Sequence, residues 1–303
     1  MRLQKFGSIL LLGSFAAVTA GTQFPAPEKG WAPLDKIFEQ AGKDLPGGVH
    51  RFGWPRTDLR VAVRGVAIEP ALALGSWAAF QATGNGDEAV ALGDLVLLAS
   101  EVNPVVAELQ SNGIEVLAIH NHLIDETPRL MYVHFHARGE ASALAEGLKA
   151  ALGKTHTPAQ AAAAPKSQAK LPEVDQSAFE KIQTVLGRRG ALAGRVLQVG
   201  VPRAGHVEES GMEVPPSMGT ATAMNFQLAG NRVAATGDFV LVADEVNPVV
   251  RELQAHGLLV TALHSHMLRE EPRLFFLHFW GIGPPEKIAE GLKEALSKVA
   301  TRP

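Results

Sequence analysis

The sequence of 303 residues contains no cysteine. This absence excludes disulfide bonds, thiolate metal sites, a cysteine nucleophile and a lipidated N-terminal cysteine. Aromatic residues make up only 6 % of the chain, with a single tyrosine, which argues against a large aromatic platform for binding sugars. Basic residues are not in excess, since 28 Lys and Arg stand against 31 Asp and Glu, so nucleic acid is not an expected partner.

The remaining composition is that of a globular protein. Hydrophobic residues account for 46 % of the chain and charged residues for 19 %, which is too apolar for a disordered chain. The length favours two domains of ordinary size. Serine-hydrolase, nucleotide-binding and HExxH zinc-protease motifs are missing. The polar residues that stand out are the 11 histidines, which are the main candidates for a functional site.

Residues 1–20 have the pattern of a secretory signal peptide. Arg2 and Lys5 precede an apolar stretch from Ile9 to Ala17, and small residues end the segment at 18–20. The apolar stretch is shorter than the roughly 20 residues that a spanning helix needs, which disfavours a membrane anchor. We therefore expect a periplasmic or secreted protein with no stable membrane span after signal removal.

The chain contains one unit written twice. Residues 93–139 align without a gap with residues 237–283 at an offset of 144, and 26 of the 47 positions are identical. Between the copies lies a stretch rich in Ala, Pro, Gln and Lys, a composition typical of a linker. We predict a first repeat over residues 21–153, a linker over 154–175 and a second repeat over 176–303.

Each repeat is predicted to be α+β. Short helices and β-rich runs alternate, and two strands joined by a short connection favour a hairpin. The fold class we expect is two homologous domains, each a mostly antiparallel sheet with packed helices. In the first repeat, strands are predicted over 59–68, 74–82, 94–99, 114–122 and 129–137, and helices over 36–42, from Asn103 to Gly113, and over 141–152.

Histidines concentrate on the predicted hairpins. In the second repeat, His264 and His266 are two residues apart and so share one face of a strand, while His278 lies on the return strand. Three imidazoles on one face suit a divalent transition metal such as zinc, copper, iron or manganese. The first repeat carries the corresponding candidate ligands and one more: His120, His122, His134 and His136.

Charged residues near each hairpin supply further candidates. Glu126 and Glu270 stand four residues beyond the second histidine of each pair and are candidate metal ligands or general bases. Arg129 and Arg273 are candidates for orienting an anionic group of a substrate. The alternative for these arginines is an ion pair with the glutamate in the same turn.

Other repeated polar residues have structural interpretations. Glu101 and Asn103, with their counterparts in the second repeat, are expected to cap a helix. Asp94 and Asp238 each follow a glycine at a predicted strand start, where aspartate commonly fixes a turn. Met267 follows His266 and is either a soft copper ligand or a packing residue.

The repeated strings GD[LF]VL, EVNPVV, LHSHM and EEPRLFFLHFW resemble the LppY/LpqO family of exported bacterial proteins. The resemblance covers both repeats. This family is a domain of unknown function, so the resemblance implies export but no activity. Lipid anchoring, which the family name suggests, does not transfer to this chain because it has no cysteine.

Two functions from different classes follow. The leading hypothesis is divalent-metal binding by a histidine cluster on each hairpin, supporting hydrolytic or oxidative chemistry on a small or carbohydrate-like substrate. The alternative is a non-catalytic periplasmic binding or scaffold protein, in which the histidines form a structural network.

Overall fold

The structure, a computed structural model, describes residues 26–159 and 173–302. The predicted signal peptide and residues 160–172 of the predicted linker lie outside the described residues. At its end, the predicted linker overlaps a helix, since α5 begins at Glu173.

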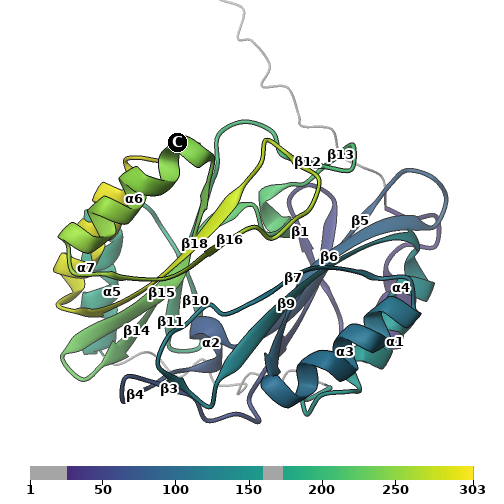
Figure 1. The fold of residues 1–303 in the computed structure, drawn as a ribbon, viewed down its shortest axis with the longest axis horizontal. Helices are drawn as coiled ribbons and strands as arrows, with labels where there is room; N and C mark the ends of the chain where they lie inside the picture. Colours follow the sequence, from purple (N-terminus) through teal and green to yellow (C-terminus); the bar gives the residue numbers. More distant parts are fainter. Residues whose placement is uncertain (1–25, 160–172, 303) are drawn as a thin grey trace, which may run out of the picture.

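Two six-stranded antiparallel sheets form the centre of the protein (Figure 1). In spatial order, the first sheet contains β1 (Lys43–Leu45), β2 (Val49–Pro55), β5 (Gly75–Ala82), β6 (Glu88–Leu98), β9 (Leu130–Glu140) and β7 (Glu115–His120). The second sheet contains β10 (Ala191–Ala193), β11 (Val196–Pro202), β14 (Ala221–Ala229), β15 (Arg232–Leu241), β18 (Phe275–Gly283) and β16 (Leu259–His264). The strand order is the same in both, so the sequence repeat is a structural repeat and the predicted fold class is confirmed.

Helices cover the outer face of each sheet (Figure 1). Apolar side chains of helix and sheet form one core per half, one around Phe80 and Leu109 and the other around Phe226 and Leu253. The first half uses α1 (Ala32–Phe38), α3 (Ala99–Ser111) and α4 (Ala141–Leu152), and the second uses α5 (Glu173–Leu186), α6 (Ala243–Ala255) and α7 (Pro285–Leu296).

The inner faces of the two sheets pack against each other. Two further apolar clusters contain residues of both halves, for example Val96 with Trp280 and Leu92 with Phe276. Hydrogen bonds also cross, as from Thr261 Oγ1 to the His122 carbonyl at 2.6 Å. The molecule is therefore a four-layer sandwich of helices, sheet, sheet and helices.

Short elements close the edges of the sandwich. The single-turn helix α2 (Pro70–Ala73) of the first half has its counterpart in the 3₁₀ turn η1 (Pro216–Met218) of the second. Two small sheets complete the fold, made of β4 (Val66–Ala67), β3 (Ala62–Val63) and β8 (Glu126–Thr127), and of β13 (Met212–Glu213), β12 (Glu208–Glu209) and β17 (Glu270–Glu271).

Several local predictions were wrong. The helix expected over 36–42 is α1, which spans Ala32–Phe38 and ends four residues earlier. Residues 59–68 were expected to form one strand but contain β3 and β4, because Arg64 and Gly65 take positive φ angles of 49° and 82° and turn the chain. Helix α3 starts at Ala99 rather than at Asn103, so Pro104 lies inside the helix. The glutamate explains the earlier start, since Glu101 Oε2 accepts the N–H of Leu98 at 2.8 Å.

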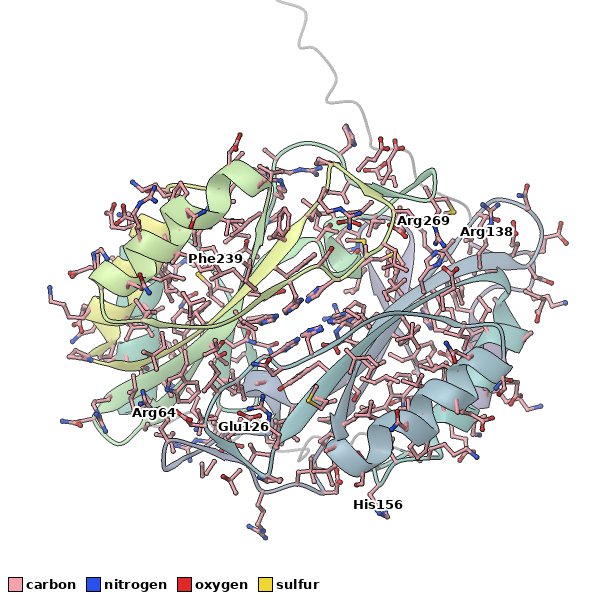
Figure 2. The ribbon with its side chains drawn as sticks, in the orientation of Figure 1. Arg64, Glu126, Arg138, His156, Phe239 and Arg269 are labelled. Atoms are coloured by element: carbon pink, nitrogen blue, oxygen red, sulfur yellow. The ribbon has the colours of Figure 1, made fainter. Side chains whose placement is uncertain are left out.

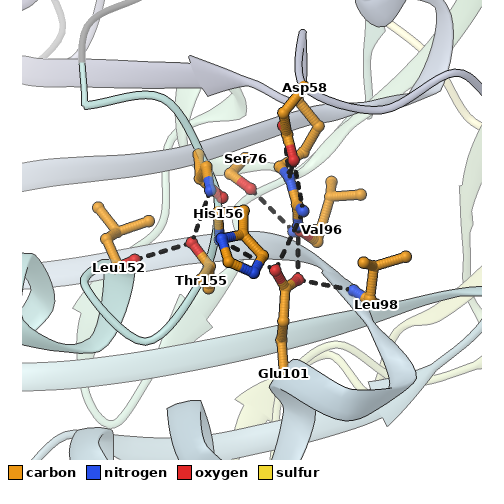
Figure 3. Close-up of polar contacts among 10 residues, drawn as sticks. Asp58, Ser76, Val96, Leu98, Glu101, Leu152, Thr155 and His156 are labelled. Atoms are coloured by element: carbon orange, nitrogen blue, oxygen red, sulfur yellow. Dashed lines mark hydrogen bonds and ion pairs between the residues drawn. The ribbon is translucent and has the colours of Figure 1, made fainter.

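The capping glutamate is also half of a buried ion pair (Figure 3). The Arg56 side chain is fully buried, and its Nη1 and Nη2 donate to the two oxygens of Glu101 at 2.7 and 3.1 Å. Glu101 Oε1 further accepts the backbone N–H of His156, which ties the chain after α4 to the same group. The expectation that Glu101 is structural is thus confirmed.

Among the described residues, no helix is both long and apolar enough to cross a membrane.

Candidate metal centre

The predicted hairpins are present as the β7–β9 and β16–β18 pairs. Across the ladder, His120 lies opposite Tyr132 and His134 lies opposite Ala118. Because His120 and His134 are on the inner face of the first sheet, their rings point into the space between the sheets. His264 and His278 occupy the matching positions in the second sheet.

The two hairpins meet and form one site rather than two separate ones. The ring of His120 stacks on that of His264 at a centroid distance of 3.5 Å. Two more ring pairs also join one histidine from each half, at 3.8 and 3.7 Å. The cluster, which we call the six-histidine centre, consists of His120, His122, His134, His264, His266 and His278.

Ring nitrogens converge at the six-histidine centre. Five of the histidines, all except His134, each place a nitrogen within 4.8 Å of the others. A second group joins His134 and His122 with Asp94. The two Nε2 atoms of His120 and His122 are 3.0 Å apart. These spacings allow several imidazoles to bind a common ion.

Six of the twelve ring nitrogens, on five of the six histidines, are buried and have no hydrogen-bond partner. A buried polar atom without a partner is rare in proteins and calls for an explanation such as a bound ion or water. The atoms concerned are His120 Nδ1, His134 Nε2, both ring nitrogens of His264, His266 Nε2 and His278 Nε2, together with Asp94 Oδ1.

The opposite side of several rings is anchored. The ring of His134 hydrogen-bonds to the backbone of Gly93, and that of His278 to the backbone of Gly237. Nε2 of both rings is buried without a hydrogen-bond partner. A backbone carbonyl holding one nitrogen while the other is free is the usual arrangement of a metal-binding histidine.

Both of these glycines are required by close backbone contacts. A Cβ at Gly93 would collide with the Trp77 carbonyl, and one at Gly237 with the Ala223 carbonyl. This explains why each repeat has glycine directly before Asp94 or Asp238.

The imidazoles of the centre are neutral in the metal-free state. Burial lowers the pKa of His120 to about 3, with a further contribution from His264. Burial also lowers the pKa of His264 to about 4. The pKa values of the other four histidines lie well below the usual value for the same reason, with neighbouring imidazoles adding to the effect. A neutral imidazole is the form that binds a metal.

Asp94 is a site residue that the sequence analysis assigned to a turn, and Asp238, also assigned to a turn, holds the equivalent position in the second sheet. Asp94 lies within β6, opposite His134, with its oxygens 3.7 Å from His134 Nε2 and 3.9 Å from His122 Nε2. Asp238 lies opposite His278 in the same way. Burial raises the pKa of Asp94 well above its usual value, and the pKa of Asp238 to about 7. The signal was available, because each aspartate lies inside an apolar run.

The glutamates and arginines predicted for the site lie outside the six-histidine centre, in the segments that connect the strands of each hairpin and contain β8 and β17. Glu270 accepts the N–H of Leu274 at 2.9 Å and the guanidinium of Arg273 at 3.2 Å. Its counterpart Glu126, visible at the edge of the sandwich in Figure 2, likewise pairs with Arg129 at 3.4 Å. Neither carboxylate belongs to the groups of converging ligand atoms. The structure thus favours the ion-pair alternative for both arginines.

His136 is separated from the six-histidine centre. Its Nδ1 lies 3.5 Å from Glu115, which in turn binds Arg269 from the other half at 3.2 Å. Figure 2 shows Arg269 in the part of the second half that reaches over the first. The second repeat has Trp280 at the position of His136, so this ion-pair group exists in one half only.

A small cavity adjoins one end of the centre. It has a volume of about 20 Å³, which is room for about one water molecule. His134 and His266 form part of its wall, and the remainder is largely apolar, including Trp77, Met218 and Met267. Met267 is buried in the apolar cluster between the sheets.

Comparison with known proteins identifies the family. No curated protein matches the chain. Two solved structures show a weak likeness. EtuB from Clostridium kluyveri has 10 % identity and a TM-score of 0.19, and the match covers 84 % of this chain and 90 % of EtuB. TP0453 in crystal form I has 11 % identity and a TM-score of 0.17, and the match covers 72 % of this chain and 79 % of TP0453. The family model DUF1529, described as Domain of Unknown Function (DUF1259), matches residues 32–154 and again residues 180–298. The chain therefore belongs to this family of unknown function and contains two tandem copies of its domain.

Proposed function

We propose that the protein binds transition-metal ions through the six-histidine centre. The observation that carries the proposal is the convergence of buried, unpartnered ring nitrogens from both halves. A purely structural histidine network would pair these atoms with each other or with the backbone. Imidazole is a ligand for zinc, copper, iron and nickel, and the metal identity stays open.

We further propose that the bound metal acts on a small molecule. A metal ion supplies Lewis acidity or an activated water to a substrate that reaches it. The cavity beside His134 and His266 admits a molecule of about the size of water. The carbohydrate-like substrate suggested by the sequence is larger than this volume, so we favour a substrate of few atoms.

Metal content and metal-dependent stability test the first proposal. Purified untagged protein is expected to retain a transition metal, and the metal-free protein should gain thermal stability when zinc or copper is added. A ligand that binds only the native state stabilises it by about 2.7 kcal/mol at a hundredfold excess over Kd. His278→Ala should reduce both the metal content and the gain.

His156→Ala provides the matched control. Its side chain is exposed and lies at the periphery, away from the space between the sheets (Figure 2), and the substitution keeps the backbone N–H that binds Glu101. This variant should respond to metal like the wild type. If His278→Ala also responds like the wild type, the histidines are structural and the metal function is refuted.

We also propose that the protein is exported and belongs with the LppY/LpqO proteins. Support comes from the signal-like pattern of residues 1–20 and from the repeated strings quoted above. N-terminal sequencing of protein from the periplasm or medium should find a chain that begins near Gly21. Retention of Met1 in the cell-associated protein would contradict export.

A further inference from the structure

The rings of the six-histidine centre form two similar triangles. The first triad, His120, His122 and His134, has centroid distances of 5.0, 4.9 and 6.2 Å. The second triad, His264, His266 and His278, has corresponding distances of 4.8, 4.9 and 5.9 Å. Each triad comes from one hairpin, so the repeat has built the same triangle twice.

The triads lie face to face. Three ring pairs cross between them: His120 with His264, His122 with His278, and His134 with His266, at 3.5, 3.8 and 3.7 Å. Their interplanar angles are 29°, 19° and 21°. Near-parallel rings this close are stacked on their faces, so the ring normals point from one triad to the other. Within each triad the rings are inclined to one another by 7° to 37°, so each triad is only approximately flat.

The size of each triangle matches a metal ion at its centre. In the second triad all three rings place a nitrogen within 4.8 Å of the others, whereas in the first triad His134 converges with His122 and Asp94. With a metal–nitrogen bond of about 2.0–2.1 Å, an ion lies about 3.2 Å from the centroid of each bound imidazole. The point equidistant from the three centroids is about 3.2 Å from each in the first triad and about 3.1 Å in the second. One ion midway between the triads would lie off the plane of all six rings.

We propose that the centre holds two metal ions, one in each triad, and this inference rests on the proposed metal-binding function. The stacking distances of 3.5 to 3.8 Å set the separation of the two triad centres. Paired metal sites that act together on one substrate have a spacing of about 3.5–4 Å. The first triad has its widest side between His122 and His134, and Asp94 faces that side as a fourth ligand.

Two dications so close repel each other, and anionic groups must offset this. Asp94 supplies a carboxylate to the first triad, and Asp238 holds the matching position opposite His278 in the second sheet. The small cavity touches His134 of the first triad and His266 of the second, which form one stacked pair. A water, hydroxide or similarly small ligand entering there reaches both ions and bridges them.

Metal stoichiometry and magnetic coupling test the pair. Untagged, metal-free protein is loaded with copper(II), excess metal is removed, and copper per chain is measured together with the electron paramagnetic resonance signal. We expect two copper ions per chain and a signal well below that of two isolated ions, because neighbouring ions couple. His134→Ala and His278→Ala, which each disrupt one triad, should retain one ion and show the full signal of an isolated copper.

The outcomes separate the two levels of the hypothesis. One copper per wild-type chain with an uncoupled signal overturns the pair but leaves the metal function intact. No retained copper overturns both. His156→Ala should behave as wild type, which excludes copper on exposed histidines. The wild-type measurement decides the question even if a triad variant fails to fold.

Discussion

The two halves of the molecule agree at the centre and differ around it. Three histidines and one aspartate occupy equivalent positions in both repeats, at an offset of 144 residues. Their surroundings differ in detail. Tyr132 stacks on His122 in one half and its counterpart Phe276 stacks on His266 in the other, so only the first half has a hydroxyl at this position. The difference indicates that the shared residues form the working part and that the flanks are free to specialise.

The residues around the six-histidine centre differ between its two ends. At the Tyr132 end, α2 and the apolar residues around Leu74 and Trp280 fill the space between the sheets. At the Phe276 end, η1 takes the place of α2, and the small cavity lies beside Met218. A small ligand would therefore approach the symmetric centre from the Phe276 end, where the cavity lies.

The largest expected difference between the halves concerns the buried ion pairs. Arg56 is fully buried and bonds Asp58 as well as Glu101, while Arg203 is slightly exposed and pairs with Glu245. Removing one member of a buried pair costs about 3–5 kcal/mol. Arg56→Ala should lower the free energy of unfolding in urea by about this amount, and Arg203→Ala by less. Equal losses would show that the two networks are equivalent.

Acid should destabilise the metal-free protein, with equal contributions from the histidines of the two halves. Burial lowers the folded-state pKa values of all six histidines, so the unfolded state binds more protons and stability falls as pH drops below about 6.5. Each buried imidazole contributes a slope of up to about 1.4 kcal/mol per pH unit. Asp94 and Asp238 act in the opposite direction, because their folded-state pKa values are raised. The six histidines outnumber these two aspartates, so the net effect of acid is destabilising.

Urea titrations from pH 7 to pH 4 measure this slope. Replacing the three histidines of one triad with glutamine should remove well over half of it, whichever triad is changed, because three histidines then stand against the same two aspartates. A slope that responds to only one triad would mean that the halves are protonated differently.

A smaller effect is expected from the one aromatic difference at the centre. Tyr132 donates its hydroxyl to the Ala73 carbonyl at 2.9 Å. Tyr132→Phe makes the first half resemble the second and should cost about 1 kcal/mol, the contribution of a typical hydrogen bond. Thermal unfolding checks the change, with Phe275→Tyr, at a partly exposed position, as a control for altering an aromatic ring. An unchanged melting temperature would show that the hydroxyl bond adds nothing.

The smallest effect is expected at the surface. Arg269 binds Glu115 across the two halves, whereas its counterpart Asp125 pairs with Arg64 in its own half. Both members of the Arg269 pair are about half exposed, so Arg269→Ala should cost less than about 1 kcal/mol and less still at high salt. A loss larger than that, measured in urea, would give this bridge a role in holding the halves together.

The sequence predicted the repeat, the hairpins and six of the residues of the centre. Periodicity within a strand places His264 and His266 on one face, and pairing brings His278 beside them. The sequence pattern does not predict that the hairpins of the two repeats meet, because that contact depends on how the inner faces of the two sheets pack. Sequence spacing also failed for Glu126 and Glu270, which were predicted as metal ligands. In the structure each carboxylate accepts a backbone N–H of its own hairpin, from Leu130 and Leu274 respectively.

The stacked triads carry a consequence for how such a protein arises. Exchanging the halves maps His120 onto His264 and the pair His122 and His278 onto His266 and His134, so the centre lies on an internal two-fold axis. This is the geometry of an isologous homodimer, in which the same patch meets itself. A chain with a single unit would have to self-associate to bury these rings. Joining two units in one chain removes the dependence on protein concentration and lets each former protomer change by itself, as the two ends of this centre have done.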